Sequence, residues 1–136
     1  MTIPILTYHA MNVIRNNYAE NEHLALASDL ETIRELGLKV IPLSQVVDWH
    51  QGSLTDEDVS ACVAITFDDG SWFDFYDLHH PTCGMQRSMF NILRDFNKRN
   101  GPSSTVVINI SSKGCASECI GKALIKSVLV IFAILG

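Results

Sequence analysis

The most constraining feature of this chain is an apolar run that ends in two acids and a glycine, residues 63–70 (VAITFDDG). The run is short and rich in β-branched residues, which predicts a buried strand. Two carboxylates at the end of a buried strand, Asp68 and Asp69, are costly unless a cation or hydrogen bonds compensate their charge. Gly70 permits a sharp turn directly after them. In layered α/β proteins, functional sites are built at this carboxyl edge of the sheet.

Strand and helix patterns alternate on both sides of this run. The expected strands cover residues 3–9, 39–43 and 105–110, and the expected helices cover residues 28–36, 44–51 and 85–100. Ser28 with Glu31 forms a capping-box pattern, Gly37 is a stop signal, and Ser44 is the expected cap of the second helix. The apolar density of the first strand suggests burial on both of its faces. The alternation predicts an α/β protein with a mainly parallel sheet.

Two stretches interrupt this alternation and are expected as loops, the polar residues 11–22 and the aromatic-rich residues 71–81. The second holds four aromatic residues directly after the acidic turn, and three of them are candidate sugar-binding residues: Trp72, Phe73 and Tyr76. They predict either a platform for sugar rings or a loop that packs its aromatic side chains on the rim of the fold. Asp74 and Asp77 are expected as surface acids, and His79 and His80 as an exposed pair.

The length and the net charge of the chain limit the number of domains and the classes of partner. A chain of 136 residues makes one domain or part of one. Its net charge of −5, from scattered acids and bases, argues against a nucleic acid or an anionic membrane as partner. Residues 1–4 (MTIP) do not begin a basic region followed by an apolar stretch, so no signal peptide is expected and the cytoplasm is the default location.

Four cysteines are too few for a disulfide scaffold, and none forms a C-x-x-C pair. Cys62 is expected as a small core residue. Cys115 and Cys119 lie four positions apart, with no third or fourth zinc ligand in the sequence around them. Residues 123–135 are strongly apolar but shorter than the roughly 20 residues that a bilayer span needs. They predict a buried strand or helix and no stable membrane span.

Four sequence features in order resemble the N-terminal part of a polysaccharide deacetylase, the NodB-homology family or carbohydrate esterase family 4. They are residues 4–9 (PILTYH), a helix ending at residues 36–37 (LG), residues 39–43 (KVIPL) and residues 66–70 (TFDDG). The resemblance covers roughly residues 3–110. It implies a partial, distorted (β/α) barrel of the NodB type within residues 1–110. Residues 111–136 then form an atypical apolar tail that need not belong to the family fold.

The resemblance also implies an activity, the metal-dependent hydrolysis of N-acetyl groups on an acetylated polysaccharide or oligosaccharide. A divalent metal such as zinc or cobalt activates water and polarises the carbonyl oxygen, and a carboxylate takes the proton from water. By the family pattern Asp68 is the base, Asp69 is the metal ligand, and Thr66 and Gly70 support them.

The sequence departs from the family in its histidines, because the H-[ST]-x-x-H motif that supplies two metal ligands is absent. His79 or His80 is considered as a substitute ligand. His9, at the end of the first strand, is either a hydrogen-bonded core residue or part of a site. The alternative to an enzyme is a truncated, non-catalytic relative that binds carbohydrate or is inactive. A phosphotransferase of the haloacid dehalogenase type would need D-x-D, and the second position after Asp68 is Gly70.

Overall fold

A central strand, β3 (Cys62–Phe67), organises the fold, as the apolar run predicts. The computed structural model describes residues 1–68, 70–100 and 109–110, the last two by their backbone alone. All but one of the β3 side chains are buried, and Thr66 is half-buried. Cys62 is among the buried residues, which confirms the expectation that it belongs to the core.

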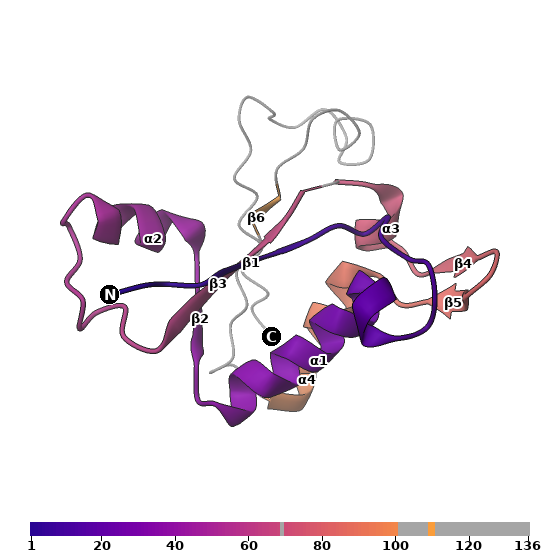
Figure 1. Cartoon of the computed structure of the whole chain (residues 1–136), viewed down its shortest axis with the longest axis horizontal. Helices are drawn as coiled ribbons and strands as arrows, with labels where there is room; N and C mark the ends of the chain where they lie inside the picture. Colours follow the sequence, from indigo (N-terminus) through magenta and orange to yellow (C-terminus); the bar gives the residue numbers. More distant parts are fainter. Residues whose placement is uncertain (69, 101–108, 111–136) are drawn as a thin grey trace.

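Three further strands pair with β3, and all of them run parallel to it (Figure 1). β1 (Ile5–Tyr8) lies along one edge of β3, and β2 (Lys39–Ile41) pairs with the other edge near its start. β6 (Asn109–Ile110) pairs with the last two residues of β3. The prediction of a mixed α/β protein with a parallel sheet is therefore confirmed, and the described strands form an open sheet, not a closed barrel.

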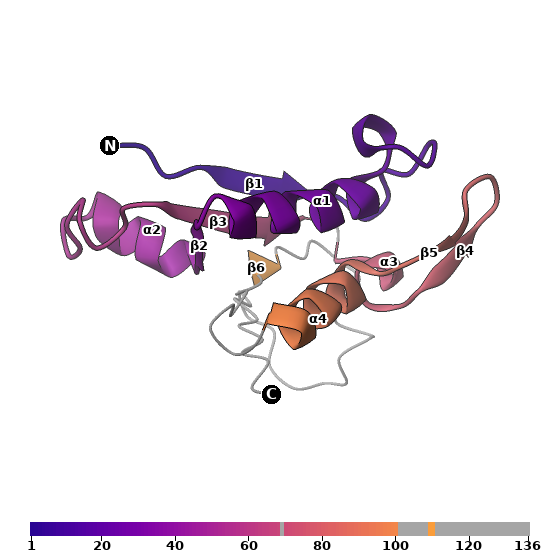
Figure 2. The same ribbon diagram turned by 90° about the horizontal axis from the view of Figure 1, so that it is seen from below.

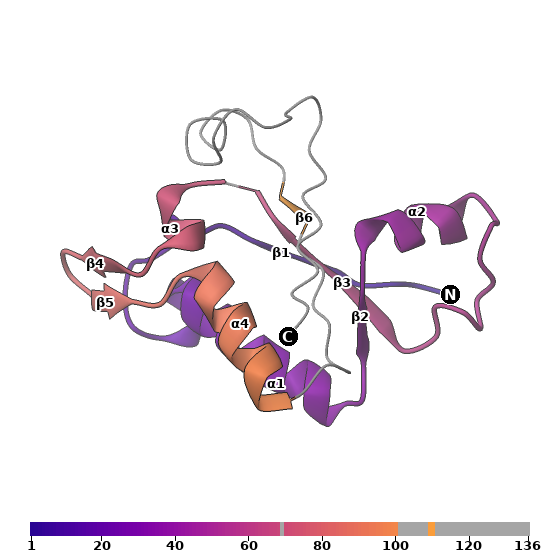
Figure 3. The same ribbon diagram turned by 180° about the vertical axis from the view of Figure 1, so that it is seen from behind.

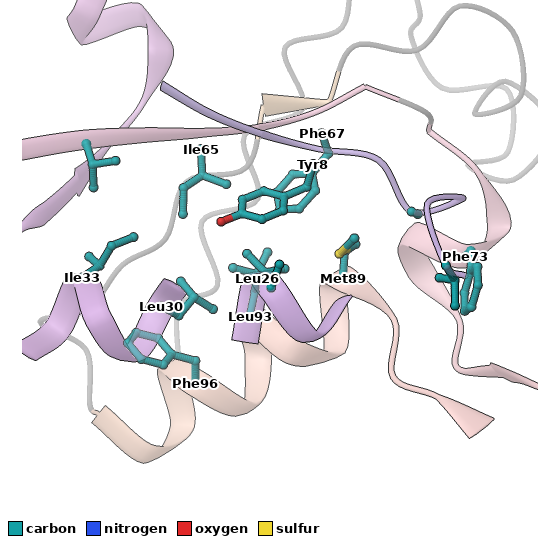
Figure 4. Close-up of a cluster of buried hydrophobic side chains, with 14 of the residues drawn as sticks. Tyr8, Leu26, Leu30, Ile33, Ile65, Phe67, Phe73, Met89, Leu93 and Phe96 are labelled. Atoms are coloured by element: carbon teal, nitrogen blue, oxygen red, sulfur yellow. The ribbon is translucent and has the colours of Figure 1, made fainter. Parts of the chain in front are cut away.

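Two helices, α1 (Glu22–Glu35) and α4 (Met89–Asn100), pack against each other beneath the sheet (Figures 2 and 3). Figure 4 shows the main core, where side chains of β1 and β3 meet those of the two helices. Its largest members are Tyr8, Ile65, Phe67, Leu26, Leu30, Ile33, Phe73, Met89, Leu93 and Phe96. Because fully burying one such apolar side chain contributes about 1.5–3 kcal/mol, this cluster is the main source of stability.

Smaller elements complete the described structure. They are the 3₁₀ turn η1 (Tyr18–Glu20), the helices α2 (Leu43–His50) and α3 (Trp72–Phe75), and a hairpin of β4 (Leu78–His80) and β5 (Gly84–Gln86). α2 packs over a second, smaller core formed by Ile3, Ile41, Val59 and Cys62. The hairpin and α3 follow the carboxyl end of β3, whereas α2 lies at its opposite end (Figure 1).

The expected burial of the first strand on both faces is wrong. Leu6 and Tyr8 contribute to the core, but Ile5 is 47% exposed and Thr7 is exposed as well. Among the described strands β1 pairs with β3 alone, so it forms an edge of the sheet. Successive side chains of a strand point to opposite faces, and only one face of β1 is covered by the helices.

The first helix begins at Glu22 and not at the predicted cap Ser28. The side-chain oxygen of Asn21 accepts hydrogen bonds from the backbone N–H groups of His23 and Leu24, at 3.1 and 3.3 Å. Asn21 is therefore the true N-cap, and asparagine is one of the residues that favour this position. The predicted loop over 11–22 contains the cap Asn21 and the first helical residue Glu22, and the predicted helix starts only at residue 28, so the prediction omits helical residues 22–27.

The ends of the next elements agree with the sequence only in part. Gly37 follows the last turn of α1 with a φ of 66°, which confirms it as the stop signal. α2 begins at Leu43 after Pro42, which caps it without a side-chain hydrogen bond, so the predicted cap Ser44 lies inside the helix. Proline suits this place because its backbone nitrogen carries no hydrogen and its φ is fixed.

Residues 71–88 also differ from the predicted loop and helix. Residues 72–75 form α3, and residues 78–86 form the β4–β5 hairpin, in which Gly84 begins β5 directly after the turn with a φ of 73°. The helix predicted from residue 85 therefore starts four residues later, at Met89. Ser88 marks this start, since its hydroxyl accepts a hydrogen bond from the backbone of Asn91 at 3.1 Å.

Several predictions fall outside the described residues. They concern the strand over 105–108, the possible zinc pair Cys115 and Cys119, and the apolar stretch 123–135. Of the helices that the structure describes, none has the length and apolar character to cross a bilayer.

Candidate functional site

The register between β1 and β3 places His9 beside Asp68. Tyr8 pairs with Phe67, and the backbone N–H of Asp68 donates to the carbonyl of Tyr8 at 3.2 Å. The next residues of the two parallel strands therefore leave the sheet together. The His9 Nε2 atom lies 3.9 Å from Asp68 Oδ2, and the two side chains are 40% and 48% exposed. An imidazole and a carboxylate thus share an accessible edge of the sheet.

Glu22 joins this pair from the first turn of α1. One of its carboxylate oxygens, Oε2, accepts a hydrogen bond of 2.5 Å from the backbone N–H of His9 and lies 3.5 Å from Nδ1 of the same residue. The other oxygen, Oε1, accepts from the Asn12 side chain at 2.5 Å. The positive end of the helix dipole favours a carboxylate at this position. Glu22 therefore connects α1 to the backbone and the ring of His9.

A second contact fixes the end of β1 to α1. The Tyr8 hydroxyl donates to Asp29 Oδ2 at 2.6 Å, and the Tyr18 hydroxyl donates to Oδ1 of the same carboxylate at 2.8 Å. Burial and the negative charge of Asp29 raise the pKa of Tyr8 well above its usual range. Tyr8 therefore stays a neutral hydrogen-bond donor, and the chain just before His9 is held at both its backbone and its side chain.

The acidic turn after β3 is described on either side of Asp69. Gly70 has a φ of 59°, which confirms the expectation that a glycine is needed to turn the chain there. Asp69 lies outside the described residues, so its role as a metal ligand stays a prediction. Among the residues that the structure does describe, no three histidine, cysteine, aspartate or glutamate side chains are grouped to hold a metal ion.

The aromatic residues after the turn separate into exposed and buried ones. Trp72, the first residue of α3, and Tyr76, which directly follows its last residue, are 50% and 51% exposed, and their ring centroids lie 5.2 Å apart. Phe73 is buried, and its ring lies 4.4 Å from that of His23. The structure thus brings Trp72 and Tyr76 together at the surface and places Phe73 in the core.

Asp74 is not the surface acid that the sequence suggests, whereas Asp77 is partly exposed. Asp74 is buried, and its carboxylate accepts from the backbone and hydroxyl of Ser71 at 2.6 and 3.0 Å, which caps α3. Asp77 accepts from the backbone of Ser88, the side chain of Asn91 and the guanidinium of Arg87. Burial opposes its charge, but these bonds outweigh burial and lower the pKa of Asp77 to about 2. Both acids hold local structure.

The two histidines considered as substitute ligands lie in β4, part of a hairpin that extends away from the sheet (Figure 1). His79 is exposed. His80 Nδ1 accepts from the backbone N–H groups of Thr82 and Cys83 at 3.4 and 3.3 Å, so it takes part in the hairpin turn. These contacts give His80 a structural role in its own loop.

A groove of about 620 Å³ lies between α1, β5 and α4, on residues that include Leu24, Met85 and Ile92. Neither His9 nor Asp68 lines it. The chemical groups of the candidate site therefore lie on the open edge of the sheet, apart from this groove.

Sequence reasoning missed Glu22 because it falls in the stretch expected as a loop. Asn21 followed directly by an acid is a helix-start signal that was available in the sequence, since asparagine caps helices and acids favour the first turn. Even so, the contact between Glu22 and His9 depends on how β1 and α1 pack, which no local pattern encodes.

Comparison with known proteins finds no protein-family model, no curated protein and no solved structure that matches this chain.

Proposed function

We propose that this chain is a polysaccharide-deacetylase-like hydrolase that removes acetyl groups from acetylated sugars. One observation carries the proposal: Asp68, at the carboxyl end of the central parallel strand, lies beside His9 from the end of the neighbouring strand. This edge is the usual location of sites in parallel α/β sheets. The residues also stand within the two motifs, 4–9 and 66–70, that resemble the deacetylase family.

The two side chains suit the hydrolysis of an amide. The reaction needs a base that takes a proton from water as the water attacks the carbonyl carbon, and a carboxylate or an imidazole can do this. Asp68 is half exposed, so both water and a large polymeric substrate can reach it. Because catalytic hydrogen bonds are often long before the substrate binds, the 3.9 Å between His9 and Asp68 is compatible with a working pair.

A divalent metal belongs to the proposal through the family resemblance. Asp68 is the base in this proposal and is not counted as a ligand, and His9 beside it offers an imidazole, a donor type that zinc accepts. The described residues contain no group of three histidine, cysteine, aspartate or glutamate side chains that could hold the ion. Asp69, next to Asp68 in the turn, is the ligand that the resemblance supplies. Bound zinc or cobalt would polarise the acetyl carbonyl and activate water.

The experiment is acetate release from N-acetylglucosamine oligomers, with zinc, cobalt or a chelator added. We expect release by the wild-type protein and a loss of about 100-fold or more in Asp68→Asn, in line with the contribution of a positioned acid or base. Asp48→Asn makes the same chemical change at an exposed position of α2, at the other end of the sheet, and should leave release unchanged. No release with any metal would overturn the proposal.

A non-catalytic carbohydrate-binding protein is the second candidate. The exposed Trp72–Tyr76 pair favours it, because adjacent aromatic faces can stack on sugar rings. This candidate predicts binding of the same oligomers without acetate release, and binding unaffected by Asp68→Asn.

A further inference from the structure

The packing of α3 separates its buried residues from an exposed aromatic pair. Phe73 and Asp74 are buried, and Phe75 packs against the main core. These three consecutive residues fix α3 to the rest of the fold. Trp72 and Tyr76, one on each side of them, are half exposed, and their rings are inclined by 31° to each other. The exposed pair is therefore held in place by its neighbours while it adds little to the core itself.

The polar groups at the edges of the two rings indicate what kind of partner the pair fits. No other described residue forms a hydrogen bond with the indole N–H of Trp72 or the hydroxyl of Tyr76. Such groups need a partner once they are covered, and a hydrocarbon chain offers none. A pyranose ring has C–H groups on its face, which the negative face of an aromatic ring attracts, and hydroxyl groups around its edge. The chemistry of the pair therefore fits a sugar ring.

The aromatic pair also lies close to Asp68, the proposed base. Trp72 follows Asp68 by four residues, and four residues span at most about 14 Å even when fully extended. Gly70, with a φ of 59°, turns the chain between them. Figure 1 shows α3 directly after the carboxyl end of β3. Since the side chain of Asp68 is 48% exposed, a short oligosaccharide can reach both its carboxylate and the rings.

We propose that Trp72 and Tyr76 form a subsite for a sugar ring next to the one that carries the reacting acetyl group, so that the chain prefers oligosaccharides to a single N-acetylated sugar. The inference rests on the proposed hydrolase function, since Asp68 marks the position of the reacting sugar. The stacked ring does not react, so its contacts are the same in the bound substrate and in the transition state. The subsite therefore adds affinity without changing the chemical step, and only substrates long enough to reach it benefit.

Kinetics with substrates of different length test this role. We expect Trp72→Ala to raise KM for the N-acetylglucosamine tetramer about 2- to 10-fold with kcat unchanged, as for a loss of uniform binding. For N-acetylglucosamine itself, which is too short to reach the subsite, neither value should change. Trp72→Phe keeps an aromatic face and should retain most of the preference for the tetramer. Val47→Ala, at an exposed position of α2 at the other end of the sheet, should leave KM for both substrates unchanged.

A binding measurement tests the subsite without catalysis. In Asp68→Asn, titration with the monosaccharide and with the tetramer, followed in ¹H–¹⁵N NMR spectra, gives the affinity that is gained through chain length. We expect this gain to fall about 2- to 10-fold when Trp72→Ala is added, and to stay the same when Val47→Ala is added. Urea unfolding of the same proteins checks that the fold is intact.

The subsite and the hydrolase function fail in different ways. An equal loss of affinity for monosaccharide and tetramer in Trp72→Ala, or no loss for either, overturns the subsite, even if the protein releases acetate. Absence of acetate release counts against the hydrolase, whereas a gain through chain length that depends on Trp72 would still support the subsite. Analytical ultracentrifugation tests another occupant of the pair, a second copy of the chain. A dimer that Trp72→Ala dissociates, without any binding of sugar, would overturn the subsite.

Discussion

His9 and His23 are held by neighbouring parts of the same fold but in opposite chemical surroundings. His9 contacts two carboxylates at the open edge of the sheet. His23 is 1% exposed, and its ring nitrogens lie 2.7 Å from the carbonyl of Arg87 and 2.8 Å from that of Ala10. The ring of Phe73 covers it at 4.4 Å.

The difference shows what each histidine can do. Two carbonyl oxygens and an aromatic ring fix His23 between α1, the end of β1 and the start of α4, where no solvent reaches it. The surroundings of His9 provide charge, access and a neighbouring acid, which are the conditions for proton transfer. We therefore assign His23 to stability and His9 to the site, and the following predictions test this division.

Replacing His23 should have the largest effect on stability. His23→Ala removes a buried ring and leaves two carbonyl groups without their partner, so we expect the free energy of unfolding to fall by about 2–4 kcal/mol. Urea unfolding followed by circular dichroism measures it. His50→Ala, an exposed histidine on α2, should stay within about 0.5 kcal/mol of the wild type. If the free energy of unfolding of His23→Ala fell no more than that of His50→Ala, the structural role of His23 would be excluded.

Replacing His9 should affect activity and not stability. In His9→Ala we expect kcat for acetate release to fall about 10- to 100-fold, with a free energy of unfolding within about 0.5 kcal/mol of the wild type because the side chain is 40% exposed. Acetate assays and urea unfolding on the same preparation separate the two effects. A His9→Ala variant destabilised as much as His23→Ala would contradict the assignment of His9 to the site and His23 to stability.

Asp77 is a second residue with a structural role, because it contacts Arg87 and the backbone of Ser88 at the start of α4. Its role can be tested by the pH dependence of the free energy of unfolding. Its pKa of about 2 in the folded protein is below the ordinary value of 3.8, so the charged carboxylate stabilises the fold above about pH 5, and this stabilisation is lost as the pH falls toward 2. We expect Asp77→Asn to be about 1 kcal/mol less stable than the wild type at pH 7, after allowance for solvent screening. Urea unfolding between pH 2 and 7 should show this gap closing on the acid side, and a gap that is constant with pH would contradict it.

The smallest effects are expected at Trp72 and Phe73, which are adjacent on α3 but lie in different surroundings, one exposed and the other buried. Trp72→Ala should weaken binding of N-acetylglucosamine oligomers by about 0.5–1.5 kcal/mol with little change in stability, as expected for the loss of an exposed aromatic surface. Phe73→Leu should lower stability, since its ring packs on His23. Isothermal titration calorimetry and urea unfolding distinguish them, and equal binding by both variants and the wild type would exclude Trp72 from a sugar platform.

The parts of the fold that the sequence predicts are those encoded by local pattern. The β-branched run of β3, the apolar stripe of α4 and the positive φ of Gly70 all follow from residue type and spacing. Helix starts were less predictable, because Asn21 and Ser88 stand in polar stretches where a cap and a loop residue look alike.

In the candidate site, only the position of Asp68 could be predicted from local sequence pattern. Asp68 is placed by the strand that precedes it, whereas its neighbour His9 is placed by the register of β1 against β3, and Glu22 by the packing of α1. The spacing of Ser71 and Asp74 fits a capping box and was available in the sequence, whereas nothing in the spacing of Asp77 shows that its carboxylate fixes the start of α4. Contacts between residues farther apart in sequence decide the roles of His9, Glu22 and Asp77.

The start of α1 carries consequences for how such a chain can vary. Asn21, Glu22 and His23 are consecutive: Asn21 caps the helix from an extended backbone, and His23 turns about 100° from Glu22 around the helix axis, so Glu22 reaches His9 and His23 enters the core. Residues 14–19 before them are exposed, but Asn16 and Tyr18 donate to Cys83 and Asp29, so insertions there should be tolerated only where these two hydrogen bonds are kept. One extra residue placed after Asn21 would rotate both the carboxylate and the buried ring out of place in a single step, so natural variants should differ in the length of the preceding segment while keeping this tripeptide in phase.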